Sequence, residues 1–183
     1  MNNQTTTQRY HSIALKVALA AIFAALVAVA TLTFVIPIPA TSGYFNLGEV
    51  IIYVAALLFG PIVGLIAGAG ASIADMLVAP QFAPGTFAIK AIEGFIVGYL
   101  TKQLNKKIKS LTLSATIAIT IGGLEMVAGY FLYETLILGY PAALALVEIP
   151  FNIVQMLVGL AIAIPIMHAV LRVFPQLKSY IQQ

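Results

Sequence analysis

Residues Ile13–Ile36 read IALKVALAAIFAALVAVATLTFVI, a run whose only charged side chain is Lys16. A helix needs about 20 mostly apolar residues to cross a bilayer, so this stretch is long enough to span one. The chain of 183 residues is 61% hydrophobic and only 8% charged. We therefore expect an all-α integral membrane protein, folded as a single domain over residues 1–183.

Further apolar runs follow, and most of them end at proline or glycine, which interrupt helices. The loop Pro37–Asn46 contains two prolines and Gly43, and we expect it to be irregular. Lys102–Lys109 reads as a charged connector. The sequence predicts a bundle of six transmembrane helices, at about 13–36, 47–59, 62–79, 87–100, 111–132 and 147–174.

The basic residues predict the orientation of this bundle. With six crossings, every lysine and arginine except Lys90 falls on one side, at the two termini and in the connector Lys102–Lys109. Cytoplasmic loops carry the excess of lysine and arginine, so both termini are predicted to be cytoplasmic. All six acidic residues fall toward the outer side.

Polar side chains in the outer half come from several helices. Charged groups inside a membrane face the bundle interior or a wet cavity and pair with one another, so these residues predict one polar pocket beneath the outer loops. Glu148, Asn152 and Gln155 share a helix face, and Lys90 and Glu93 could pair within a turn. Glu134 is expected to be exposed near a helix end. The candidate substrate-binding residues are Tyr44, Asn46, Glu49, Asp75, Lys90, Glu93, Glu125, Glu148, Asn152 and Gln155.

Small residues form a stripe along the first helix, at Ala14, Ala18, Ala21 and Ala25. Small side chains let helix backbones approach closely in lipid. The stripe either packs inside the bundle or forms a docking face for a partner subunit, and the sequence leaves both open.

The residues that several kinds of functional site require are absent from the sequence. The chain has no cysteine and no G-x-x-x-x-G-K-[ST] motif, and its two histidines, His11 and His168, lie away from the polar residues. We expect no metal site, no cofactor and no ATPase site. The basic residues flank helices and form no stripe with interleaved aromatics, so nucleic acid is not an expected partner.

Four segments together resemble a known family. They are PIPATSGYFNLGE (Pro37–Glu49), LFGPIVG (Leu58–Gly64), GAGASIAD (Gly68–Asp75) and APGTFAIK (Ala83–Lys90), which Glu93-Gly94 follows. This pattern resembles the substrate-binding S components of energy-coupling factor (ECF) vitamin transporters, of the riboflavin/hydroxymethylpyrimidine type.

The resemblance implies a multi-pass protein of a prokaryotic plasma membrane with a vitamin pocket near the outer face. It also implies a transmembrane coupling subunit and two ATPase subunits as partners. In the family, A-x-x-x-A alanines of helix one face the coupling subunit; here Ala14/Ala18, Ala20/Ala24 and Ala21/Ala25 all match that pattern.

The first hypothesis is therefore a binding subunit, itself not an enzyme, for a small water-soluble vitamin or precursor. Hydroxymethylpyrimidine, a pyridoxine-type compound and riboflavin are the candidate ligands. A self-sufficient oligomeric transporter or channel is the alternative. The third hypothesis is an intramembrane enzyme that uses the carboxylates of Asp75 and Glu125.

Overall fold

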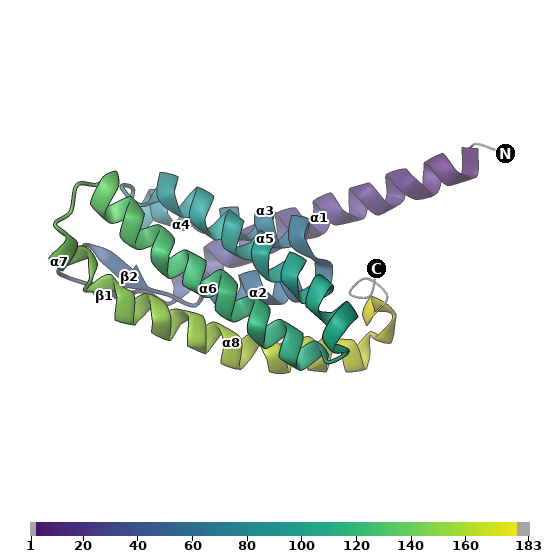
Figure 1. Ribbon diagram of the computed structural model, residues 1–183. Coiled ribbons are helices and arrows are strands. Elements are labelled where there is room, and N and C mark those ends of the chain that lie inside the picture. The colour runs from purple at the N-terminus through teal and green to yellow at the C-terminus, as the bar shows by residue number, and fades with distance from the viewer. Residues whose placement is uncertain (1–2, 179–183) are drawn as a thin grey trace.

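The apolar runs of the sequence form helices that pack side by side in a computed structural model, which describes residues 3–178 (Figure 1). A two-stranded hairpin and a short helix lie at one end. The elements are α1 (Asn3–Thr33), β1 (Ile36–Ile38), β2 (Gly43–Phe45), α2 (Gly48–Phe59), α3 (Pro61–Ala69), α4 (Ala71–Val78), α5 (Ala83–Ile108), α6 (Leu111–Leu136), α7 (Ala142–Ala145), α8 (Glu148–Val173) and the 3₁₀ turn η1 (Pro175–Leu177).

The loop predicted to be irregular is instead an antiparallel hairpin. Ile36 pairs with Phe45 and Ile38 with Gly43, and Ser42 has the positive φ of 63° at the turn. With only two strands, each is an edge strand, where a proline is tolerated because its missing N–H need not join a ladder. The hairpin also ends α1 at Thr33, earlier than predicted, and it is an exception to the all-α prediction.

The helix α5 extends beyond its predicted bounds of 87–100 at both ends. It begins at Ala83, because Pro84 occupies the first turn, where an N–H has no intrahelical partner. It continues to Ile108 through the residues predicted to be a charged connector, and Lys109 ends it in the left-handed conformation with a φ of 55°. The lysines of the connector thus belong largely to the last turns of a helix.

Among the described residues, four helical stretches are long and apolar enough to cross a membrane: Ile13–Thr33, Pro61–Val78, Leu111–Leu136 and Ala142–Val173. The second of these combines α3 and α4, which meet at Gly70. The helix α2 is apolar but has only 12 residues, and α5 carries five charged residues along its length. The count of six spans therefore stays a prediction.

The short helix α2 lies at the centre of the bundle. It contacts α1, α3, α5 and α8, and ten of its residues are buried. A helix that is apolar all round is suited to a position enclosed by other helices rather than to one facing lipid. This central position gives α2 a role in joining the two halves of the chain.

A seam of glycines brings α3 and α5 together. A Cβ atom at Gly64 would clash with the backbone carbonyl of Gly94, and one at Gly68 would clash with the carbonyl of Lys90. Gly98 lies against the junction of Gly60 and Pro61 in the same way. Small residues that permit such contact are a common way to join helices in lipid.

The ends of the bundle differ in charge. The N-terminal part of α1, the junction of α5 and α6, and η1 lie at one end, opposite the hairpin and α7 (Figure 1). Lys106, Lys107, Lys109 and Arg172 lie at the first end. This arrangement agrees with the charge pattern from which cytoplasmic termini are predicted.

The glycine seam yields a first prediction. Gly64→Ala and Gly94→Ala should each lower the free energy of unfolding by about 1–3 kcal/mol, the usual effect of overpacking. Thermal unfolding in detergent, followed by circular dichroism, measures the change. Ala88→Val, on the exposed face of α5, is the control and should have little effect. Unchanged stability of both glycine variants would show that the seam adapts without strain.

Candidate functional site

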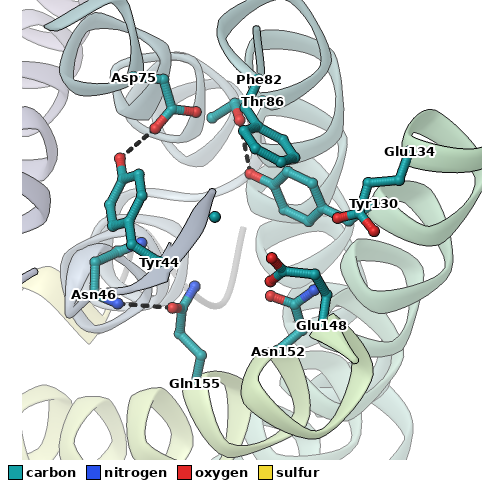
Figure 2. A pocket seen from close by; sticks show the side chains of 11 residues that line it. Tyr44, Asn46, Asp75, Phe82, Thr86, Tyr130, Glu134, Glu148, Asn152 and Gln155 are labelled. Atoms are coloured by element: carbon teal, nitrogen blue, oxygen red, sulfur yellow. Dashed lines mark hydrogen bonds between the residues drawn. The ribbon is translucent and has the colours of Figure 1, made fainter. Parts of the chain in front are cut away.

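A cavity lies beneath the hairpin, and its empty volume of about 360 Å³ includes space that is open to solvent. The hairpin, α4, α5, α6 and α8 all contribute to its wall (Figure 2). The lining residues are Gly43, Tyr44, Asn46, Asp75, Phe82, Thr86, Tyr130, Glu134, Glu148, Asn152 and Gln155.

The hairpin is attached to the surrounding helices by polar contacts. The hydroxyl of Tyr44 donates to Asp75 on α4, and that of Thr41 donates to Glu148 on α8. The backbone N–H of Asn46 donates to Oε1 of Gln155 at 2.9 Å. These bonds join the roof of the cavity to opposite walls, so they hold the hairpin over it.

Two details adapt the hairpin to this position. A side chain at Gly43 would clash with the carboxylate of Glu148, so glycine permits the close approach of strand and helix. Burial, together with the neighbouring carboxyl of Asp75, raises the pKa of Tyr44 above its usual range. Its phenol therefore remains a hydrogen-bond donor at neutral pH.

Helix spacing places the remaining lining residues. Phe82 and Thr86, and likewise Tyr130 and Glu134, are four residues apart, so each pair shares a helix face. The hydroxyls of Thr86 and Tyr130 are 2.8 Å apart, which links α5 to α6. Asn152 and Gln155 face the cavity from α8, as their spacing predicted.

The predicted site residues separate into two groups. The cavity is lined by six of them: Tyr44, Asn46, Asp75, Glu148, Asn152 and Gln155. The other four, Glu49, Lys90, Glu93 and Glu125, do not line it. Sequence position gave the height of these side chains in the bundle, but it did not give the direction in which each helix face turns.

Lys90 is the centre of the second group. Its ammonium contacts Glu49 on α2 and lies 3.2 Å from Oε2 of Glu93. All three side chains are buried, with at most 3% exposed. Tyr53 donates to Oε1 of Glu93 at 2.6 Å. These contacts join α2 to α5 in the interior, so the possible Lys90–Glu93 pair is present as part of a larger buried cluster.

Tyr130 separates the cluster from the cavity. Its ring lines the cavity, and the centre of that ring is 5.4 Å from Nζ of Lys90. An ammonium at such a distance from an aromatic face is attracted by the ring quadrupole. Glu125 is near enough to interact electrostatically with Lys90 and Glu93, so it belongs with the cluster.

Sequence reasoning missed Gly43, Phe82, Thr86, Tyr130 and Glu134. Glu134 was expected to be exposed, and the structure corrects this: only 1% of it is exposed. The helix α6 extends to Leu136, past its predicted end, and the loop after it covers Glu134, whose carbonyl accepts from the N–H of Tyr140. Glu134 lies four residues after Tyr130 on the same helix face, and this spacing was the signal that could have placed it at the cavity.

Comparisons with known proteins bear on this arrangement. Residues 12–172 match the family described as "ECF-type riboflavin transporter, S component". The chain belongs to this family. A solved S component, described as "Structure and mechanism of the S component of a bacterial ECF transporter", has the same fold, with a TM-score of 0.64 and 20% identity. The match covers 86% of this chain and 95% of that one.

A relative from Pyrococcus woesei, described as "Uncharacterized protein in gap 3'region", is 38% identical over 137 residues. The match covers 74% of this chain and 88% of the relative. As an ECF S component, the chain is a multi-pass membrane protein and a substrate-binding subunit that works with an ECF transporter module. The family is one of transport subunits rather than of enzymes.

The buried cluster yields a second prediction. Lys90→Met leaves two buried carboxylates without their counter-charge, so the free energy of unfolding should fall by about 3–5 kcal/mol. Circular dichroism in detergent measures this change, and the exposed Lys107→Met is the control. Combining Lys90→Met with Glu49→Gln and Glu93→Gln should restore part of the stability. If Lys90→Met keeps its stability and loses only ligand binding, Lys90 belongs to the ligand site instead.

Proposed function

We propose that this S component captures a small water-soluble vitamin or vitamin precursor in the cavity beneath the hairpin. The observation that carries the proposal is the cavity itself: a polar site roofed by a hairpin, at the end of the bundle opposite the basic residues. Carboxylates, amides and aromatic rings line it together, which suits a ligand with several hydrogen-bonding groups. Hydroxymethylpyrimidine, a pyridoxine-type compound and riboflavin remain the candidates.

In the proposed mechanism, the hairpin acts as a lid. Its contacts with Asp75, Glu148 and Gln155 close the cavity after the ligand enters from outside. Both termini are then cytoplasmic, in a prokaryotic plasma membrane with six crossings. The ligand leaves toward the cytoplasm only when the subunit docks on a transmembrane coupling subunit driven by two ATPase subunits, because the sequence has no nucleotide-binding motif of its own.

The docking face in this proposal is the alanine stripe of α1. Ala14, Ala18, Ala21 and Ala25 are all exposed. Ala20, by contrast, is 1% exposed, so an Ala20/Ala24 pair faces the bundle. Among the four apolar spans, α1 is also the least buried. In its most apolar 18-residue stretch 17% is buried, against 50% for Pro61–Val78. These facts favour Ala14/Ala18 and Ala21/Ala25 as the outward pairs.

The molecule that co-purifies with the chain, identified by mass spectrometry, tests the proposal directly. Purified S component should bind it without partners, and reconstituted vesicles should accumulate it only when the coupling subunit, both ATPases and ATP are present. Accumulation by the chain alone would support the self-sufficient transporter instead. A chemically altered product would support an enzyme.

The cavity wall yields a third prediction. Asn152→Ala and Gln155→Ala should each weaken binding of the co-purifying molecule by roughly 5- to 150-fold, because a hydrogen-bonding group is left unpaired. Only Gln155→Ala should also speed hydrogen exchange at the amide of Asn46, which donates to Gln155. Gln103→Ala, exposed on α5, is the control. Normal affinity in both variants would remove α8 from the ligand site.

The stripe yields a fourth prediction. Ala18→Trp and Ala21→Trp should leave ligand affinity near normal while they prevent assembly with the coupling subunit and ATP-driven uptake, because a bulky side chain keeps the helix backbones apart. Leu26→Trp, exposed on a different face of α1, is the matched control and should assemble. Uptake at the normal rate by both alanine variants would place the docking face elsewhere.

A further inference from the structure

The cavity has an unbalanced charge. Three carboxylates line it, those of Asp75, Glu134 and Glu148, and the described lining residues include no lysine, arginine or histidine. The imbalance extends beyond the lining. By their places along the helices, all six acidic residues lie toward the end of the bundle that holds the cavity, and among the described side chains Lys90 is the only lysine or arginine there.

Lys90 does not neutralise the cavity. Its side chain is 3% exposed, and its ammonium contacts Glu49 and Glu93 and lies 5.4 Å from the centre of the Tyr130 ring. Those two carboxylates, with Glu125 close by, already outnumber it. The carboxylates of the cavity therefore have no counter-charge from the described part of the protein.

The three carboxylates also differ in the partners they have. Asp75 accepts from Tyr44 and Glu148 accepts from Thr41, both neutral hydroxyl donors. Glu134 is 1% exposed, and its Oε2 has no hydrogen-bond partner among the described residues. A buried polar atom without a partner is uncommon, and a buried charge is costly unless it is paired. Glu134 is thus the group that the cavity leaves for a ligand.

The rest of the wall indicates the shape of that ligand. The rings of Tyr44, Phe82 and Tyr130 lie around the cavity, with the amides of Asn152 and Gln155 between them (Figure 2). Aromatic rings stack on other rings and attract cations over their faces. Rings on the wall that can stack therefore favour a flat, aromatic ligand.

We infer that the ligand is a small aromatic heterocycle that carries a positive charge, as a protonated amine or an amidinium-type group, and that Glu134 is its principal counter-ion. Asp75 and Glu148 hold the lid and add to the negative potential, while the aromatic rings contact the heterocycle. The inference rests on the proposed function, because it takes the cavity to be the substrate site.

Matched compounds test the charge. Pyridoxamine and pyridoxine share one ring, but one substituent is an ammonium in pyridoxamine and a neutral hydroxyl in pyridoxine. Thiamine, a permanent cation, and riboflavin, a neutral vitamin, extend the comparison. Calorimetry on the purified full chain should show tighter binding of the cation in the matched pair. Glu134→Gln should weaken binding of the cations by roughly 10- to 150-fold, the effect of losing a charge-assisted bond. Glu125→Gln, an acid outside the lining, should not.

A second arm needs no ligand. If Glu134 lacks a counter-charge, Glu134→Gln should raise the unfolding midpoint of the ligand-free protein, followed by circular dichroism, whereas Gln103→Ala, exposed on α5, should leave it unchanged. Riboflavin or pyridoxine binding at least as tightly as its cationic counterpart, with no loss in Glu134→Gln, would overturn the inference and leave the proposed function intact. If no compound binds, the proposed function loses support, and an unchanged midpoint in Glu134→Gln would also overturn the charge inference.

Discussion

The contact of one buried ammonium with two buried carboxylates holds the centre of this bundle. Lys90 on α5 reaches Glu49 on α2, while Tyr53 of α2 donates to Glu93 of α5. Breaking one member of such a cluster leaves a charge stranded in a medium that solvates it poorly. The relative position of α2 and α5 is therefore restricted, and with it the floor of the cavity, because Tyr130 lies against Lys90 on the other side.

The rest of the cavity, above this floor, is held by contacts that are weaker and more easily replaced. The hairpin forms its roof through one hydrogen bond to α4 and two to α8. A rigid interior beneath a roof held by separate bonds suits a protein that must enclose a ligand and later release it. Regions with few buried apolar contacts open at lower free energy than packed cores do.

Much of this arrangement was predictable from the sequence, for a simple reason. In lipid the apolar runs reveal the helices, and the scarcity of charge makes each charged residue informative. Gly60-Pro61 gave the break between α2 and α3, and Pro80 the end of α4, although Pro84 lies inside the first turn of α5 rather than before it. The hairpin was not predicted, because its pairing depends on contacts with distant helices and not on its own residues.

The sequence could not predict that the polar residues divide into a group that lines the cavity and a buried cluster. Counting residues along a helix gives depth, but the direction of Glu49 or Glu93 depends on how α2 and α5 rotate against each other. Glu134 shows the same limit at a helix end. It was expected to be exposed, yet the loop that follows α6 covers it.

The close approach of Gly43 to Glu148 has an evolutionary consequence. Any side chain at position 43 would require the flexible end of the side chain at position 148 to move, so these two positions, distant in sequence, are coupled. In relatives with a larger residue at position 43, we expect a shorter one at position 148. The two positions should then covary among relatives.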